Sequence, residues 1–415
     1  MDSVRKNNQI KNFLHLLQDA LECNKIPELD SPDWAQLFYL SKLHNVVSLG
    51  YESVKRMPVE DGPDQELRKR WKYENDQSTF QCIYQQAALE ELKECFEREQ
   101  IPVILLKGAV LREYYPREDL RTMADLDILI QKEDISRIRS LLSCMGYKAE
   151  AVDSRNEDVY TRDECVTLEV HRELFWKQDA WNEYFQHVWK RTEKLPGYNW
   201  VQIMNPEDFY FHLLGHMIHH MHNGGIGIKA FLDIKIFQEQ NREKLETEEF
   251  QDTLKAFHLE KLNENIGKLF LWWEEEDQTD SLMEAWTEFI INCGAYGEVG
   301  NFIITNPAFS EFQENQRKGF RYRYIWRRLF PTYEEMKYMY PKAKKYTYFY
   351  YVGKRIYQNG IRRKKNIKRE FDMIRKLELD KVEQLHRLYN DLGVPPVSSD
   401  NAENTSKSLK NADFP

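Results

Sequence analysis

The 415-residue chain contains few cysteines and no paired cysteine motif. Its six cysteines are scattered, and none of them forms a C-x-x-C pair. A disulfide-stabilised secreted domain or a structural zinc site would need regularly spaced cysteines. The first residues, MDSVRKNNQIKNF, also lack the apolar segment of a secretory signal. These absences predict reduced thiols and a cytoplasmic location.

Long apolar runs and an excess of basic residues are also missing. No run approaches the ~18 to 20 apolar residues of a membrane-spanning helix, so we expect no membrane span. Lysine and arginine total 59 against 68 aspartate and glutamate, a net charge of −9, which argues against a dedicated nucleic-acid binder. The Lys-, Arg- and Tyr-rich stretch 342–376 is a local exception, and it predicts either an RNA contact or a solvated helical face.

Apolar spacing divides the chain into four parts. With 41% hydrophobic and 31% charged residues, the composition is that of a globular protein. Helical spacing dominates residues 1–98 and 206–395, whereas short apolar or alternating runs indicate strands within 99–205. We expect strands near 101–106, 124–130, 147–152, 158–162 and 166–171. The polar segment 396–415 is predicted to be a disordered tail. The fold class is therefore α+β, with a strand-containing core between N-terminal and C-terminal helical regions.

A pair of carboxylates gives the first functional indication. In Ala124-Asp125-Leu126-Asp127, alternation along a strand would place Asp125 and Asp127 on one face. Two adjacent carboxylates repel unless a cation lies between them, and Mg²⁺ or Mn²⁺ accepts such hard oxygen ligands together with substrate phosphates. An upstream buried strand and Gly108 favour nucleotide phosphoryl chemistry. The alternative is a solvated D-x-D on an edge strand.

The segment LLKGAVLREYYPREDLRTMADLDILI resembles a known family. Lys107-Gly108 followed by Asp125-x-Asp127 resembles the G-S/G…D-x-D/E signature of the polymerase-β-like nucleotidyltransferase superfamily. The whole segment, with PEDFYFHLLGHMIHH, FLDI and LFPTYEEMKYMYP, is more closely similar to the bacterial uncharacterised nucleotidyltransferase family, over roughly residues 30 to 360. The resemblance implies a small mixed-sheet core. It also implies Mg²⁺-dependent transfer of a nucleoside monophosphate from an NTP to an acceptor hydroxyl, on a small molecule, protein or RNA.

The resemblance also assigns roles to individual residues. Asp125, Asp127 and a third carboxylate would hold metal, and Glu169 in Leu168-Glu169-Val170-His171 is the best match for the third. Glu169 would also accept the acceptor's proton. It could instead be a surface or salt-bridged residue, with Asp158 and Asp163 as competitors.

Further residues complete the predicted site. His171 would orient Glu169 or contact the acceptor, or it could be a half-buried structural histidine. Lys107 and Arg121 would clamp the triphosphate, although Lys107 could pair with an aspartate instead. Gly108 and Ala109 would bind phosphate. Because Ala109 replaces the Ser or Gly common at this position, binding there would rest on backbone N–H groups.

Four histidines share one broad face of the helix predicted to begin at Pro206: His212, His216, His219 and His220. Zinc would accept imidazoles, but H-E-x-x-H is absent. We therefore expect helix packing, with His216 and His220 on the acceptor side of the cleft, or a bond to a buried carboxylate such as Asp233.

Two other functions stay open at this point. One is a toxin-like nucleotidyltransferase that modifies tRNA or protein. The other is a catalytically silent relative that binds a nucleotide or a partner.

Overall fold

The computed structural model describes most of residues 2–295, with gaps at 23–26, 155–156, 164, 176–180 and 275–279. Beyond residue 295 it describes 343–362 and 379–395 continuously, and scattered positions elsewhere. The predicted disordered tail, 396–415, and part of the basic stretch 342–376 lie outside the described residues. No helix in the described part is long and apolar enough to cross a membrane.

Four helices form the N-terminal region: α1 (Asp2–Glu22), α2 (Trp34–Leu43), α3 (Val47–Arg56) and α4 (Gln65–Glu99). Helix α4 contains no glycine or proline, and the Asp64 carboxylate caps it by accepting from the Leu67 N–H at 2.8 Å. Asp33 caps α2, because its carboxylate accepts from the Gln36 N–H.

Seven strands form one mixed sheet in the order β3-β4-β5-β2-β1-β7-β6. Strand β1 runs parallel to β7, and β2 runs parallel to β5, whereas the remaining neighbours are antiparallel. The α+β class is thereby confirmed. Two short strands near residue 200 were not predicted, because neither contains the continuous apolar run that marks β1. The strands are β1 (Val103–Leu105), β2 (Leu126–Ile130), β3 (Lys148–Ser154), β4 (Glu157–Arg162), β5 (Val166–His171), β6 (Thr192–Lys194) and β7 (Val201–Met204).

Short helices connect these strands. They are α5 (Lys107–Leu111), α6 (Ile135–Cys144), α7 (Asn182–Phe185) and 3₁₀ turns at Arg112–Tyr114, Glu118–Leu120, Lys132–Asp134 and Val188–Lys190.

The C-terminal region begins with α8 (Pro206–His222). Asn205 caps this helix by accepting from the Asp208 N–H at 2.7 Å, and Pro206 occupies its first turn. The other described helices are α9 (Ile228–Gln240), α10 (Arg242–Leu245), α11 (Glu248–Ala256), α12 (Glu260–Glu274), α13 (Ser281–Cys293), α18 (Tyr348–Arg362) and α20 (Leu379–Leu392), with a 3₁₀ turn at Lys345–Thr347.

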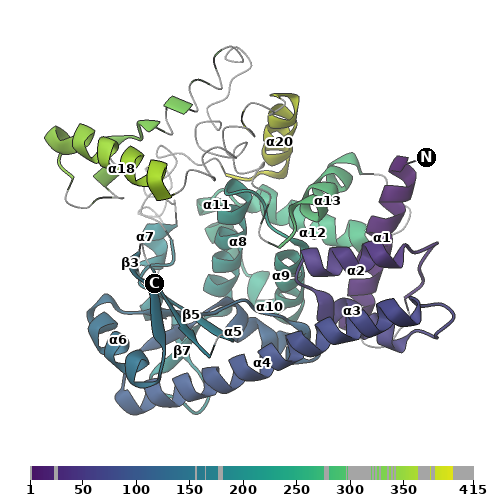
Figure 1. Cartoon of the computed structure of the whole chain (residues 1–415), viewed down its shortest axis with the longest axis horizontal. Coiled ribbons are helices and arrows are strands. Elements are labelled where there is room, and N and C mark those ends of the chain that lie inside the picture. The colour runs from purple at the N-terminus through teal and green to yellow at the C-terminus, as the bar shows by residue number, and fades with distance from the viewer. Residues whose placement is uncertain are drawn as a thin grey trace.

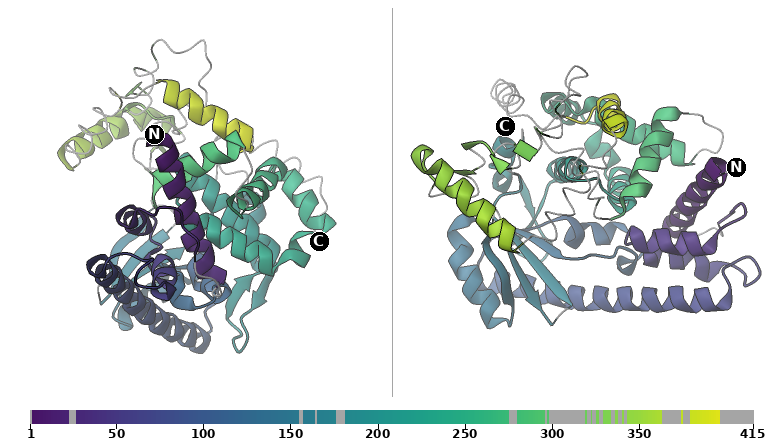
Figure 2. Two further views of the ribbon diagram at one scale, coloured as in Figure 1. Left: turned by 90° about the vertical axis from the view of Figure 1, so that its right-hand side faces the viewer. Right: turned by 45° about the horizontal axis from the view of Figure 1, so that its top comes forward.

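The two faces of the sheet pack against different helices. Leu126, Ile128 and Ile130 of β2 join a core with α4 and α6, whereas Leu129 joins a second core with the N-terminal and C-terminal helices. Figure 1 shows α4 extending along one side of the molecule, and in the right-hand view of Figure 2 the sheet lies beside one end of α4. Because side chains alternate along a strand, Asp127 lies on the same face of the sheet as Leu129, the face that packs against the second core.

Candidate active site

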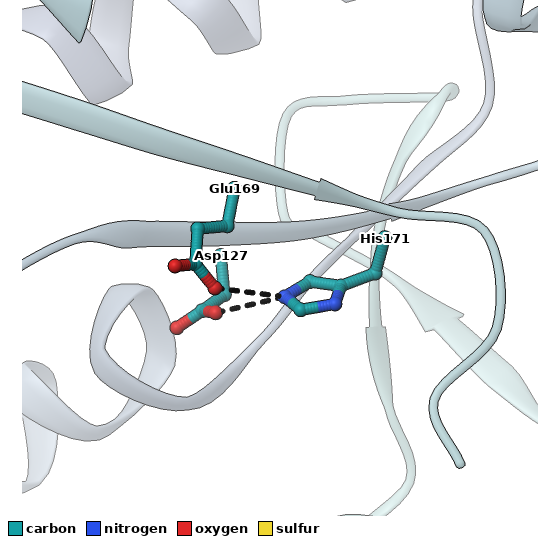
Figure 3. Close-up of side chains that lie close together, drawn as sticks. All are labelled: Asp127, Glu169 and His171. Atoms are coloured by element: carbon teal, nitrogen blue, oxygen red, sulfur yellow. Dashed lines mark hydrogen bonds and ion pairs between the residues drawn. The ribbon is translucent and has the colours of Figure 1, made fainter. Parts of the chain in front are cut away.

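Strands β2 and β5 bring the predicted carboxylates together. Their parallel register pairs Asp127 with Glu169 and Leu129 with His171. Because side chains alternate along both strands, Asp127, Glu169 and His171 share one face of the sheet. Figure 3 shows the two carboxylates side by side, with the His171 ring facing both. Residues 42 positions apart in the chain thus form one cluster, as the sequence analysis expected.

The three side chains are close enough to share a metal ion. The Nε2 atom of His171 lies 2.9 Å from Oδ1 of Asp127 and 3.6 Å from Oε2 of Glu169. One ligand atom from each residue lies within 4.8 Å of the others, the one such group of three found among the described residues. Two carboxylates beside an imidazole fit a divalent cation, and the second carboxylate of the D-x-D pair would add another oxygen.

The acidic residues differ in how readily they ionise. Burial raises the pKa of Glu169 to about 7, and the charges of Asp127 and Asp125 act in the same direction. Burial and the charge of Asp127 likewise raise the pKa of Asp125. Burial also opposes ionisation of Asp127, but the Lys107 ammonium and the His171 hydrogen bond outweigh it and lower that pKa. A cation among these carboxylates would relieve their mutual repulsion.

Lys107 is the first residue of α5, two residues after β1, and it contacts the acidic cluster. Its ammonium is 3.1 Å from Oδ1 of Asp127, so the aspartate pairing left open by the sequence is present. Lys107 also has a left-handed φ of 37°, a conformation that costs a non-glycine residue free energy. This strain and the contact with Asp127 together place Lys107 in the site.

Arg121 is held by a carboxylate rather than left free. Its guanidinium forms a bidentate pair with Asp233 of α9 at 2.8 and 2.9 Å, and Tyr115 donates to the same carboxylate at 2.8 Å. Arg121 is 6% exposed, so it anchors the loop before β2 to α9. A phosphate contact by Arg121 stays a prediction. The proposed bond from the helix histidines to Asp233 was wrong, because Arg121 and Tyr115 occupy that carboxylate.

Gly108 and Ala109 have local packing roles. A side chain on Gly108 would collide with Met123 and Arg121, so small size is needed there whatever the ligand. The Ala109 N–H already donates to the Leu106 carbonyl at 3.1 Å. The predicted phosphate contacts of both residues therefore remain predictions.

The two competitors of Glu169 lie elsewhere. Asp158 is fully buried and pairs with Arg139 and Arg172, each at 2.7 Å. The side chain of Asp163 is 84% exposed in the turn between β4 and β5. Neither carboxylate belongs to the cluster around Asp127.

The helix histidines are in contact with one another. The Nε2 atoms of His216 and His220 are 3.0 Å apart, and the buried His212 ring packs against aromatic side chains. Burial lowers the pKa of His212 to about 3 and of His220 to about 4, and the charge of Lys107 contributes to both shifts. Their rings are therefore neutral at physiological pH and lie within electrostatic range of the acidic cluster. In the described part of the chain, they belong to no group of three ligands.

Two residues that hold the loop before β2 were not predicted. Gln85 of α4 donates to the Met123 carbonyl at 3.1 Å, and Tyr115 donates to Asp233. These partners are 38 and 118 positions apart, and such contacts leave no local pattern in the sequence.

A model of the uncharacterised nucleotidyltransferase family matches residues 30–273, more than half of the chain. The chain therefore belongs to this family, which confirms the resemblance at the family level and indicates nucleotidyl transfer as its general function. Searches of curated proteins and of solved structures gave no match.

Proposed function

We propose that this protein transfers a nucleoside monophosphate from an NTP to an acceptor hydroxyl and releases pyrophosphate, as a member of the polymerase-β-like superfamily. The observation that carries the proposal is the pairing of Asp127 with Glu169 on adjacent parallel strands. Asp125 precedes Asp127 by two residues. Burial and the charge of Asp127 raise the pKa values of Asp125 and Glu169, and carboxyl groups shifted in this way are typical of catalytic sites.

Mg²⁺ or Mn²⁺ is the proposed cofactor. Asp125, Asp127 and Glu169 would hold it, because hard oxygen ligands and substrate phosphates suit both ions. Bound there, the ion would neutralise the negative charge of the phosphates.

The chain's own residues then supply proton transfer and positioning. The acceptor oxygen forms a bond to the α-phosphorus, and the bond from that phosphorus to the bridging oxygen breaks. Pyrophosphate leaves with the electron pair. Glu169 accepts the proton of the acceptor hydroxyl, because its carboxylate lies in the cluster beside Asp127 and can act as a general base there. His171 orients Glu169 through the contact at 3.6 Å.

Other residues would position the two substrates. We assign Lys107, Gly108 and Ala109 to the nucleotide. Arg121 would act on the nucleotide mainly by fixing the loop, because its guanidinium is bound to Asp233. His216 and His220 would lie on the acceptor side. The acceptor itself is a small molecule, protein or RNA, and the basic stretch 342–376 offers an RNA contact. A cytoplasmic location would supply the NTP.

A transfer assay tests the proposal and separates the acceptor classes. The protein is incubated with a cell extract, Mg²⁺ and each of four α-labelled NTPs, and the products are digested separately with nuclease and protease. We expect label from one or more NTPs to become covalently attached to an acceptor, and to be lost in Asp127→Asn. Loss of label on nuclease or protease digestion would favour a toxin-like enzyme. Binding of NTP with no transfer would favour the silent relative.

A further inference from the structure

A lysine that pairs with no carboxylate among the described residues is bound to the loop that precedes the acidic pair. Lys229 is the second residue of α9, and its ammonium is enclosed by protein although part of its side chain reaches the surface. Its one hydrogen bond runs to the backbone carbonyl of Thr122 at 3.1 Å. Within the described residues it forms no ion pair. Lys235, on the same helix, pairs with both Glu239 and Glu274.

This position is unfavourable for a cation. Burial opposes the charge of Lys229, and the nearby Arg121 guanidinium repels it, so its pKa falls to about 8. A positive charge in the first turn of a helix also opposes the helix dipole. Asp233 attracts Lys229 but is already bound to Arg121 and Tyr115. A buried ammonium in an electrostatically unfavourable position is expected where the protein binds an anionic ligand.

The charge of Lys229 acts directly on the acidic pair. The Lys229 ammonium is bound to the carbonyl of Thr122, three residues before Asp125, and its charge acts to lower the pKa of Asp125. Lys107 contacts Asp127, the other aspartate of the pair. Two ammonium groups, from α5 and from α9, therefore flank the D-x-D motif. A polyphosphate bound beside these carboxylates would be negatively charged, so both ammonium groups could bind it.

We propose that Lys229 binds the β- and γ-phosphates of the nucleotide and then the departing pyrophosphate. This inference rests on the proposed function, because it assumes that an NTP occupies the acidic site. A lysine ammonium is a point-charge donor suited to phosphate, and at this position it neutralises charge that develops on the leaving group. No signal in the sequence marked Lys229, since the chain places it more than 100 residues after the D-x-D motif.

Ligand binding by two charge-altered variants tests this role. Lys229→Gln removes the charge but keeps a donor for the Thr122 carbonyl, and Lys229→Arg keeps the charge. Lys235→Gln is the control, on the same helix and outside the site. Binding of Mg²⁺ with NTP, nucleoside monophosphate or inorganic pyrophosphate is measured by calorimetry, with melting temperature as a check of folding.

The expected result is selective. Lys229→Gln should weaken NTP and pyrophosphate binding roughly 10- to 100-fold, the loss expected of a hydrogen bond to a charged group. Monophosphate binding should change little, Lys229→Arg should recover part of the loss, and Lys235→Gln should bind as the parent does. The melting temperature of Lys229→Gln should not fall, because a disfavoured charge has been removed.

Two results would overturn the inference. Unchanged pyrophosphate affinity in Lys229→Gln would overturn it while leaving the proposed function standing. A lowered melting temperature with equal losses for all three ligands would show that Lys229 only supports the loop. If the parent binds pyrophosphate through Lys229 but no NTP, the proposed function fails and the anion site remains.

Discussion

Glu169 is a carboxyl group whose chemistry depends on its neighbours. It lies opposite Asp127 across the β2–β5 pair, and burial with the nearby negative charges raises its pKa to about 7. As the general base, it should be indispensable for the rate but not for nucleotide binding. Glu169→Gln keeps the shape and removes the proton acceptor, so we expect transfer to slow by ~10²- to 10⁴-fold while NTP affinity changes much less.

Radiolabel transfer and NTP binding check this expectation together. Asp163→Asn is the control, because its exposed side chain lies in a turn away from the cluster. Asp127→Asn should damage both binding and transfer. If Asp163→Asn abolished transfer and Glu169→Gln left it intact, the site would have to be redrawn around Asp163.

At the residue scale, strand alternation and the family resemblance together predicted which side chains gather in the cluster. Alternation placed Asp127 on one strand face and Glu169 with His171 on another, and only the adjacency of the two strands had to come from the family resemblance. The partner of Arg121 could not be predicted in this way. Its charge suggested a phosphate clamp, but its partner is 112 positions away on α9, beyond any local pattern.

Among the elements, α9 fixes the loop that presents the acidic pair. The pair formed by Asp233 and Arg121 is buried on both sides, with side chains 8% and 7% exposed. Removing one partner leaves a buried charge uncompensated, which typically costs about 3 to 5 kcal/mol. We therefore expect Asp233→Asn to lower the free energy of unfolding by about that amount even without nucleotide, as measured by urea denaturation.

An exposed pair on the same helix provides the comparison. Glu239 pairs with Lys235 but is 58% exposed, so Glu239→Gln should change stability by only about 0 to 1 kcal/mol. If Asp233→Asn were as mild as Glu239→Gln, the pair would not anchor the loop. Arg121 would then be free for the phosphate role first inferred from its charge.

The predictability of each element depended on its local sequence pattern. Helix α8 begins at Pro206, as the sequence predicted, whereas its Asn205 cap was not predicted. Strands β6 and β7 have no continuous apolar run that would mark them as strands. Strand β7 pairs with β1 and β6 pairs with β7, and the sequence alone does not show these pairings.

At the scale of the whole molecule, the N-terminal and C-terminal helical regions share one hydrophobic core. Phe13 of α1, Leu37 of α2, Phe231 of α9 and Trp286 of α13 all belong to it. The boundaries predicted at residues 98 and 206 therefore separate segments of the chain that pack together. The site lies between this core and the sheet, so its geometry depends on both helical regions.

His44 joins the two regions and should make the whole fold sensitive to acid. It is fully buried after α2, and its Nε2 lies 3.1 Å from the Ile291 carbonyl of α13. Its Nδ1 accepts from the Ile228 N–H at the start of α9 at 3.3 Å, a role that requires an unprotonated nitrogen. Burial accordingly lowers the pKa of His44 to about 4.

The direction of the pH effect follows from that lowered pKa. Above about pH 6.5 His44 is neutral in both the folded and the unfolded chain, so it adds no pH dependence. As the pH falls from about 6.5 towards 4, the unfolded chain binds a proton that the folded chain does not, and stability is lost. The loss attributable to His44 should be about 2 kcal/mol at pH 5.

Urea unfolding at pH 7.5 and 5.0 measures this loss of stability in the parent and in His44→Gln, which cannot be protonated. The variant should be less stable at pH 7.5 but should lose about 2 kcal/mol less on acidification, while His187→Gln, at an exposed position, should behave as the parent. An equal loss in the parent and His44→Gln would show that the junction between the two helical regions tolerates a charged imidazole.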